Sequence, residues 1–226
     1  MTPPPPARSV YERELTDLND SVLRMGSLTK AAIENAFTAL ETSDSGLAQT
    51  VISGDQEINQ IRFHIEEQAQ RTLATQQPAA RDLRFIIAVI HTAVELERIG
   101  DHASGIARIA LRTQTVPGTD LDWVRLPKMA NRAGNMLDQA MEAFATRNVE
   151  IAERIVKRDQ KLDRHYAKFF TEAMAHMSDT QRAEYATYLL WVAHNLERIG
   201  DRVTNIAERV IFMVTGQYTE VLEDYG

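Results

Sequence analysis

Apolar residues recur along most of the chain at spacings of three and four, the period of an α-helix with one buried face. Prolines interrupt this pattern only at residues 3–6, 78, 117 and 127, between the long periodic stretches. The sequence lacks both sustained two-residue alternation and Asn-Gly or Asp-Gly hairpin turns. The pattern therefore predicts an all-α protein of six helices. The first three are expected at 10–42, 47–75 and 78–113. The fourth ends at 146, the fifth spans 148–176, and the sixth runs from a capping box at 178–181 to 215.

The third and sixth predicted helices share more than an apolar pattern. A shift of 100 residues aligns 94–111 with 194–211, and 8 of these 18 positions are identical. A shift of 104 aligns the earlier helices, but only 3 of 19 positions agree between 22–40 and 126–144. We predict an internal duplication into two tandem three-helix bundles at 9–114 and 119–216, with a disordered proline-rich tail (1–8) and an acidic C-terminal tail (217–226).

Composition narrows the class of protein. With 44% hydrophobic residues among 226 the chain can form a core, and without cysteine any metal would need oxygen or nitrogen ligands. The formal net charge of -7 argues against nucleic-acid binding, which usually needs a basic surface. Its apolar runs are far shorter than the roughly 20 residues that span a bilayer, and its N-terminus does not resemble a signal peptide. We expect a cytoplasmic protein that does not span a membrane.

One segment, LERIGD, occurs at residues 96–101 and again at 196–201. Glu97 and Asp101 are four residues apart, as are Glu197 and Asp201, so each pair lies on one helical face with Cβ atoms about 5–6 Å apart. Like charges at this spacing repel, and the glycine between them costs about 1 kcal/mol relative to alanine in a helix interior. A metal ion that bridges the carboxylates would offset the repulsion.

Neighbouring helices offer further ligands. If the second and third helices of each bundle are antiparallel, the segments DQEIN (55–59) and DQKLD (159–163) approach LERIGD. The sixth helix adds oxygen and nitrogen donors at spacings of three and four. The additional candidate ligands are Asp55 and Asn59 in the first half, and Asp159, Asp163, His194, Asn205 and Glu208 in the second. The alternative interpretation is a solvated acidic face whose charge is balanced by Arg98 and Arg198.

The segments LERIGDHASGIAR (96–108), LERIGDRVTNIAE (196–208), DQEIN, DQKLD and ARDLRFIIAVI (80–90) resemble the PhoU family of phosphate-signalling regulators, over the chain after about residue 8. The resemblance implies two three-helix bundles side by side, no enzymatic activity, and divalent or iron-type metal ions (Fe, Zn, Mn or Mg) on the acidic motifs. The ligands that it implicates are Glu97, Asp101, Asp159, Asp163, Glu197, Asp201, Asn205 and Glu208.

The resemblance also implies partners. These are the ATPase subunit of a phosphate-specific ABC transporter and a phosphate sensor histidine kinase, which the regulator restrains when phosphate is plentiful. Association with the membrane would then be peripheral, through these partners, and the chain would form a homodimer.

The two halves differ within the motif. Gly105, Arg108 and Asn59 stand where the second half has Asn205, Glu208 and Asp163. We therefore expect the first site to bind metal more weakly or to hold fewer ions. Two alternative functions are a carboxylate-bridged di-metal enzyme and a metal-free helical adaptor. The enzyme is disfavoured because none of the six histidines lies three residues after a glutamate, as in the Glu-x-x-His motif of ferritin-like sites.

Overall fold

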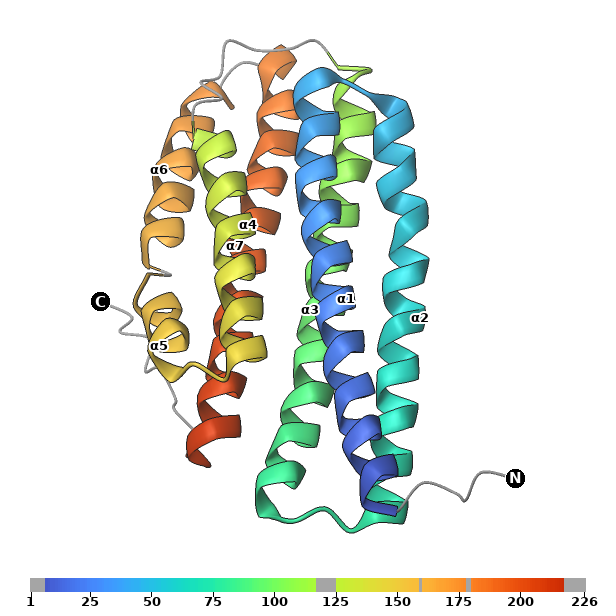
Figure 1. Ribbon diagram of the computed structural model, residues 1–226. Helices are drawn as coiled ribbons and strands as arrows, with labels where there is room; N and C mark the ends of the chain where they lie inside the picture. The colour runs from blue at the N-terminus through green and yellow to red at the C-terminus, as the bar shows by residue number, and fades with distance from the viewer. Residues whose placement is uncertain (1–6, 117–124, 159, 178–179, 218–226) are drawn as a thin grey trace.

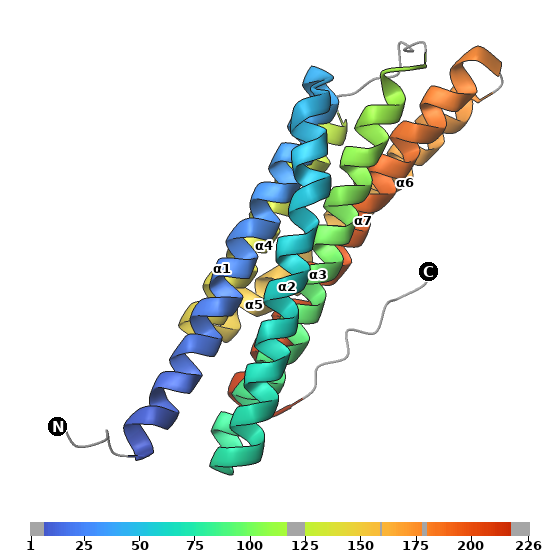
Figure 2. The same ribbon diagram turned by 90° about the vertical axis from the view of Figure 1, so that its right-hand side faces the viewer.

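The computed structural model describes residues 7–116, 125–158, 160–177 and 180–217. Within these ranges every regular element is a helix, and the two groups α1–α3 and α4–α7 lie side by side with their long axes roughly parallel (Figure 1 and Figure 2). The predicted all-α fold of two tandem bundles is confirmed. The helices are α1 (Ala7–Thr42), α2 (Ser45–Gln76), α3 (Ala80–Thr113), α4 (Arg125–Thr146), α5 (Val149–Arg158), α6 (Gln160–His176) and α7 (Thr180–Thr215).

The second helix of each repeat begins with the same kind of cap. The side chain of Asp44 accepts a hydrogen bond from the backbone N–H of Leu47 at 2.9 Å, and that of Asn148 accepts one from Ile151 at 3.1 Å. These side chains satisfy N–H groups that have no partner within the helix. Since Asp44 and Asn148 are 104 residues apart, the cap is retained where most of the surrounding sequence has diverged.

The predicted helix at 148–176 corresponds to α5 and α6, which lie on either side of residue 159. Apolar periodicity continues through both. Residue 159, between them, lies outside the described residues, as do 1–6 of the expected N-terminal tail, the capping residue Ser178, and 218–226 of the C-terminal tail.

Helices α3 and α7 form the centre of the molecule and run antiparallel to each other (Figure 1). Helix α3 contacts α1, α2 and α7, whereas α7 also contacts α4, α5 and α6. Small residues on α3 allow this close packing because their side chains add little volume between the backbones. The apolar stripe of α3 is buried throughout: Val89, Ala93, Leu96, Gly100, Ala103, Ala107 and Ala110.

Two polar contacts cross from α3 to α7 and are related by the internal repeat. His102 Nδ1 lies 3.0 Å from Asn195 Oδ1, and Arg202 Nη1 lies 3.4 Å from Glu95 Oε2. The two pairs exchange under the shift of 100 residues, so the repeats meet through a local twofold relation. Gly105 makes room for Asn195, since a Cβ atom at residue 105 would lie only 3.1 Å from Asn195 Oδ1.

None of the helices in the described ranges combines the length and apolar character that a bilayer crossing requires.

Candidate metal centre

Three carboxylates of the second repeat converge near the middle of the molecule. Asp163 comes from the first turn of α6, and Glu197 and Asp201 come from successive turns of α7. Each offers an oxygen atom, and the three oxygens lie within 4.8 Å of one another. Asp163 is exposed, whereas Glu197 and Asp201 are partly buried. The spacing of four residues on α7 and the packing of α6 against α7 produce this arrangement.

The donor set and its spacing fit a metal ion. Two oxygens that bind one ion at about 2.0–2.6 Å lie at most about 4–5 Å apart, so a single cation can bridge the three carboxylates with little movement. Oxygen donors of this kind suit hard cations such as Mg²⁺ and Mn²⁺, and carboxylates also bind Zn²⁺ and iron. The ion would neutralise negative charge that the fold concentrates between α6 and α7.

Cationic and aromatic groups border this cluster. Arg198 Nη1 lies 2.7 Å from Asp201 Oδ2, and His194 Nδ1 lies 3.6 Å from Glu197 Oε2. The ring centroid of Tyr166 lies 5.9 Å from that of His194. Burial and the charge of Glu197 raise the pKa of Tyr166, because both disfavour the phenolate. His194 is half-exposed at the edge of the cluster, where its imidazole could supply a nitrogen ligand.

The first repeat also brings three carboxylates near one another, but arginines accompany them. Burial and the charge of Asp101 raise the pKa values of both Asp55 and Glu97. Arg62 Nε and Arg98 Nε approach Glu97 at 3.9 and 3.5 Å. Arginines therefore supply positive charge that a metal ion would otherwise provide.

Asp55 is held close to α3 because residue 100 is glycine. A Cβ atom at Gly100 would lie 3.2 Å from Ile58 Cδ1 and 3.5 Å from Asp55 Oδ1. Asp55 Oδ1 is buried and has no hydrogen-bond partner among the described residues, whereas Asp55 Oδ2 accepts a bond of 3.3 Å from Asn59 Nδ2. Arg108 lowers the pKa of Asp55, opposing the effect of burial. Asn59 thus hydrogen-bonds within α2, and Arg108 brings positive charge where the second repeat has a glutamate.

We expect Glu97→Gln to stabilise the metal-free protein at neutral pH. Because the folded-state pKa of Glu97 is raised above its ordinary 4.5, the folded protein holds this proton more tightly than the unfolded chain. The resulting stabilisation is fully present below about pH 4.5 and is lost as pH rises through the higher folded-state pKa. The uncharged glutamine avoids that loss, so the advantage of the variant should grow between pH 4 and pH 7, to on the order of 1 kcal/mol.

Urea denaturation of chelator-treated protein across this pH range measures the difference. Glu153→Gln, at an exposed position on α5, is the matched control and should show no such trend. A difference between Glu97→Gln and the parent protein that stayed constant with pH would contradict the expectation.

The remaining predicted ligands of the second repeat are not among the three clustered carboxylates. Asn205 and Glu208 are partly buried further along α7, Asn205 one turn beyond Asp201. Asp159 lies outside the described residues. The structure therefore brings together Asp163, Glu197 and Asp201, with His194 at their edge.

Sequence reasoning missed the arginine beside the first acidic group. Arg62 is four residues before Glu66 and bonds to it at 2.6 Å, which is the only pairing that helical spacing would indicate. Its approach to Glu97 depends on how α2 packs against α3. A sequence comparison of the repeats offers a partial signal, because Arg62 corresponds to Tyr166 in the second repeat.

Comparison with known proteins covers both halves of the chain. A family model described as the PhoU domain matches residues 22–110 and 126–210. The phosphate-specific transport system accessory protein PhoU homolog of Pseudomonas aeruginosa is 37% identical over 207 residues, which are 91% of this chain and 86% of that protein. The phosphate-specific transport system accessory protein PhoU of Escherichia coli (strain K12) is 35% identical over 208 residues, which are 92% and 86% of the two chains.

Solved structures agree with these matches. The crystal structure of PhoU from Pseudomonas aeruginosa superposes with a TM-score of 0.87 at 36% identity, covering 92% of this chain and all of that one. The phosphate transport system regulatory protein PhoU from Streptococcus pneumoniae also gives a TM-score of 0.87, at 31% identity, and covers 93% of this chain and all of that one.

Proposed function

This chain belongs to the PhoU family, and we propose that it is a cytoplasmic, non-enzymatic accessory protein of phosphate transport that represses phosphate uptake and phosphate-starvation signalling. The observation that supports this proposal is the match of the family to both repeats, together with relatives of nearly the same length that are named as accessory proteins of a phosphate-specific transport system. A regulator of this kind acts through its surfaces rather than through turnover of a substrate.

The acidic clusters are part of the proposal. A metal ion held by Asp163, Glu197 and Asp201 would join α6 to α7 and fix the face that these helices form. The second repeat is the preferred site, because Arg62 and Arg108 supply positive charge around the acids of the first, and the second repeat has no arginine at either equivalent position. Which ion is bound depends on the geometry of the site, on its ligand types and on the availability of each metal.

The partners in this proposal are the ATPase subunit of a phosphate-specific ABC transporter and a phosphate sensor histidine kinase, with the chain acting as a homodimer. Copurification of each partner with the full chain tests these contacts, and light scattering of the purified chain tests the dimer. A monomeric mass, or failure to retain either partner under conditions where both are expressed, would count against the corresponding part of the proposal.

We expect deletion of the gene, in a host with a single copy, to raise alkaline phosphatase activity strongly in phosphate-rich medium. The reason is that the sensor kinase would no longer be restrained when phosphate is plentiful. Reintroducing the full chain should restore repression. Alkaline phosphatase assays on the parent, deletion and complemented strains measure the effect, with immunodetection to show that the reintroduced chain accumulates.

Repressed enzyme levels in the deletion strain, equal to those of the parent, would overturn the regulatory proposal. The di-metal enzyme makes a different prediction, namely catalytic oxygen consumption by the purified protein supplied with ferrous iron. Sustained turnover of this kind would favour the enzyme over the regulator.

A further inference from the structure

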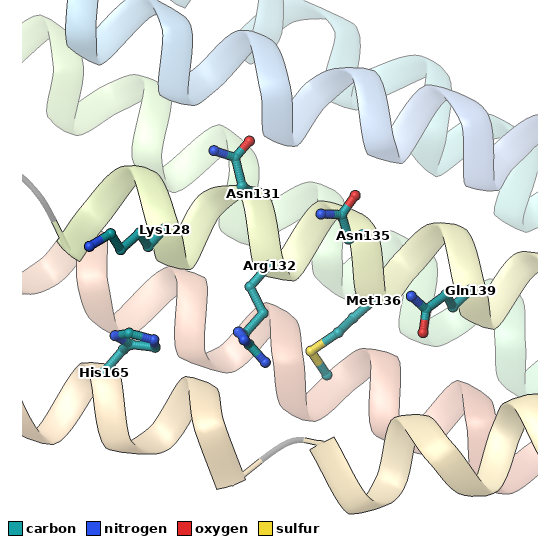
Figure 3. A pocket seen from close by; sticks show the side chains of 7 residues that line it. All are labelled: Lys128, Asn131, Arg132, Asn135, Met136, Gln139 and His165. Carbon is teal, nitrogen blue, oxygen red and sulfur yellow. The ribbon is translucent and has the colours of Figure 1, made fainter.

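A pocket of about 430 Å³ opens between α4 and α6, and its lining residue on α6, His165, is two positions after Asp163 of the acidic cluster. Arg132 and Met136 extend from α4 toward α6, and His165 extends from α6 toward α4, with Lys128 also on the wall (Figure 3). The asparagines of the rim point the other way, toward α1 (Figure 3). The side chains that face the space between α4 and α6 are therefore mainly nitrogen donors.

The cations of this pocket have no compensating charge among the described residues. The pocket has no acidic residue in its lining, and neither Lys128 nor Arg132 pairs with a carboxylate in the described part of the chain. The Nδ1 atom of His165 is buried and has no hydrogen-bond partner among the described residues. Arg125 is also nearby, but it is paired with Glu172 at 2.7 Å. In a protein with a formal net charge of -7, acidic partners for these cations are plentiful, so a group of described cations without one, beside a buried polar atom without a hydrogen bond, calls for an explanation.

Four positive charges lie near the His165 ring, on Arg132, Arg125 and Lys128 from α4 and on Lys168 from α6. An anion between α4 and α6 would relieve their mutual repulsion.

A pocket of the first repeat overlaps the same position and shares two equivalent lining residues with it. It lies between α1 and α2, has a volume of about 530 Å³, and includes Arg24 and Ile61 in its lining. Under the shift of 104, Arg24 corresponds to Lys128 and Ile61 to His165, while Arg132 corresponds to Leu28. Arg24 Nη2 is paired with Glu57 Oε1 at 2.8 Å.

Charge has also changed along the outer helix. The positions of Glu57 and His64 on α2 are occupied on α6 by Lys161 and Lys168. The two repeats thus form overlapping pockets, but among the described residues only the pocket of the second repeat is lined by unpaired cations. Packing alone does not account for this difference, because the first repeat forms its pocket without them.

We propose that the pocket between α4 and α6 binds the phosphoryl group of inorganic phosphate or of a small phosphate monoester, through Lys128, Arg132 and His165. Arginine presents a planar fork of donors that matches phosphate oxygens, and lysine adds a point charge. A phosphoryl oxygen or its proton can satisfy the buried Nδ1 of His165. The pocket exceeds the size of one phosphate ion, so an ester would extend along Met136 and Gln139.

Isothermal titration calorimetry of the full chain at low ionic strength tests this proposal, with inorganic phosphate and glycerol 3-phosphate as probes. We expect saturable binding of at least one probe, weakened at least about tenfold in Lys128→Gln combined with Arg132→Gln. The matched control is Arg24→Gln, in the overlapping pocket of the first repeat, which should bind as the parent does. His165→Ile, which introduces the residue of the first repeat, should weaken binding severalfold and provides a second variant if the double variant does not fold.

The two probes distinguish the sources of the phosphoryl group. Tighter binding of inorganic phosphate identifies the free ion as the ligand, and tighter binding of glycerol 3-phosphate identifies an ester; both support the site. Absence of saturable binding by the parent protein would overturn it. So would equal weakening by Arg24→Gln, which would indicate diffuse attraction, or unchanged affinity in both the double variant and His165→Ile. These outcomes are independent of the alkaline phosphatase result, because they concern binding alone.

Discussion

Protein with Glu197→Ala and Asp201→Ala together is expected to lose the metal ion that we propose for the second repeat, with affinity reduced more than about 100-fold. The double variant removes two of the three carboxylates whose oxygens lie within 4.8 Å of one another. Asp163 would remain, but a single exposed carboxylate provides neither the charge nor the number of ligands that a hard cation requires. Loss of binding should therefore be nearly complete at micromolar metal concentrations.

Mass spectrometric metal analysis after loading with Mn²⁺, Zn²⁺ or Fe²⁺ and dialysis measures this loss. Glu97→Ala with Asp101→Ala is the matched control, because it makes the same change in the first repeat. We expect it to remove less metal, since Arg62 and Arg108, which have no arginine counterpart in the second repeat, already offset the charge of the acids in the first. Metal content in the second-repeat variant equal to that of the parent protein, with its helical content retained, would refute the assignment of the site.

The convergence of Asp163 with Glu197 and Asp201 could be predicted because it depends on local rules. Helical spacing places residues four apart on one face, and a short connection makes successive helices antiparallel neighbours. Both rules act within a single repeat. Because the duplication placed the motif in both repeats, their residues could also be compared position by position, and that comparison predicted unequal chemistry in the two halves.

Features that depend on contacts between helices were not predictable in the same way. Arg62 approaches Glu97 only through the packing of α2 on α3, and His102 meets Asn195 only because α3 and α7 cross between repeats. The basic pocket is a similar case, because Arg132 and His165 are 33 residues apart on different helices and neither belongs to a recognisable motif. Side-chain periodicity reveals which face is buried, but not which helix covers it.

The contacts between repeats predict that the two halves unfold together. Phe85 on α3 belongs to the first repeat and Phe144 on α4 to the second; both are buried, and their ring centroids are 6.3 Å apart. The guanidinium of Arg147, the residue that follows α4, lies 5.2 Å from the centroid of the Phe85 ring. Lys30 on α1 pairs with Asp138 on α4. A core shared in this way couples the free energies of unfolding of the repeats.

Phe85→Ala is therefore expected to lower the free energy of unfolding by about 3–5 kcal/mol, through the cavity it leaves and the loss of its contact with Phe144. Both tryptophans, Trp123 and Trp191, lie in the second repeat, so their fluorescence reports that half, whereas circular dichroism reports all helices. Because the substitution is in the first repeat, a coupled protein should shift both denaturation curves together. Phe63→Ala, at a position 59% exposed in the same repeat, should shift neither by more than about 1 kcal/mol. If Phe85→Ala moved the circular dichroism curve but left the fluorescence curve in place, the repeats would be independent folding units, and a ligand bound to one would have no route through the shared core to the other.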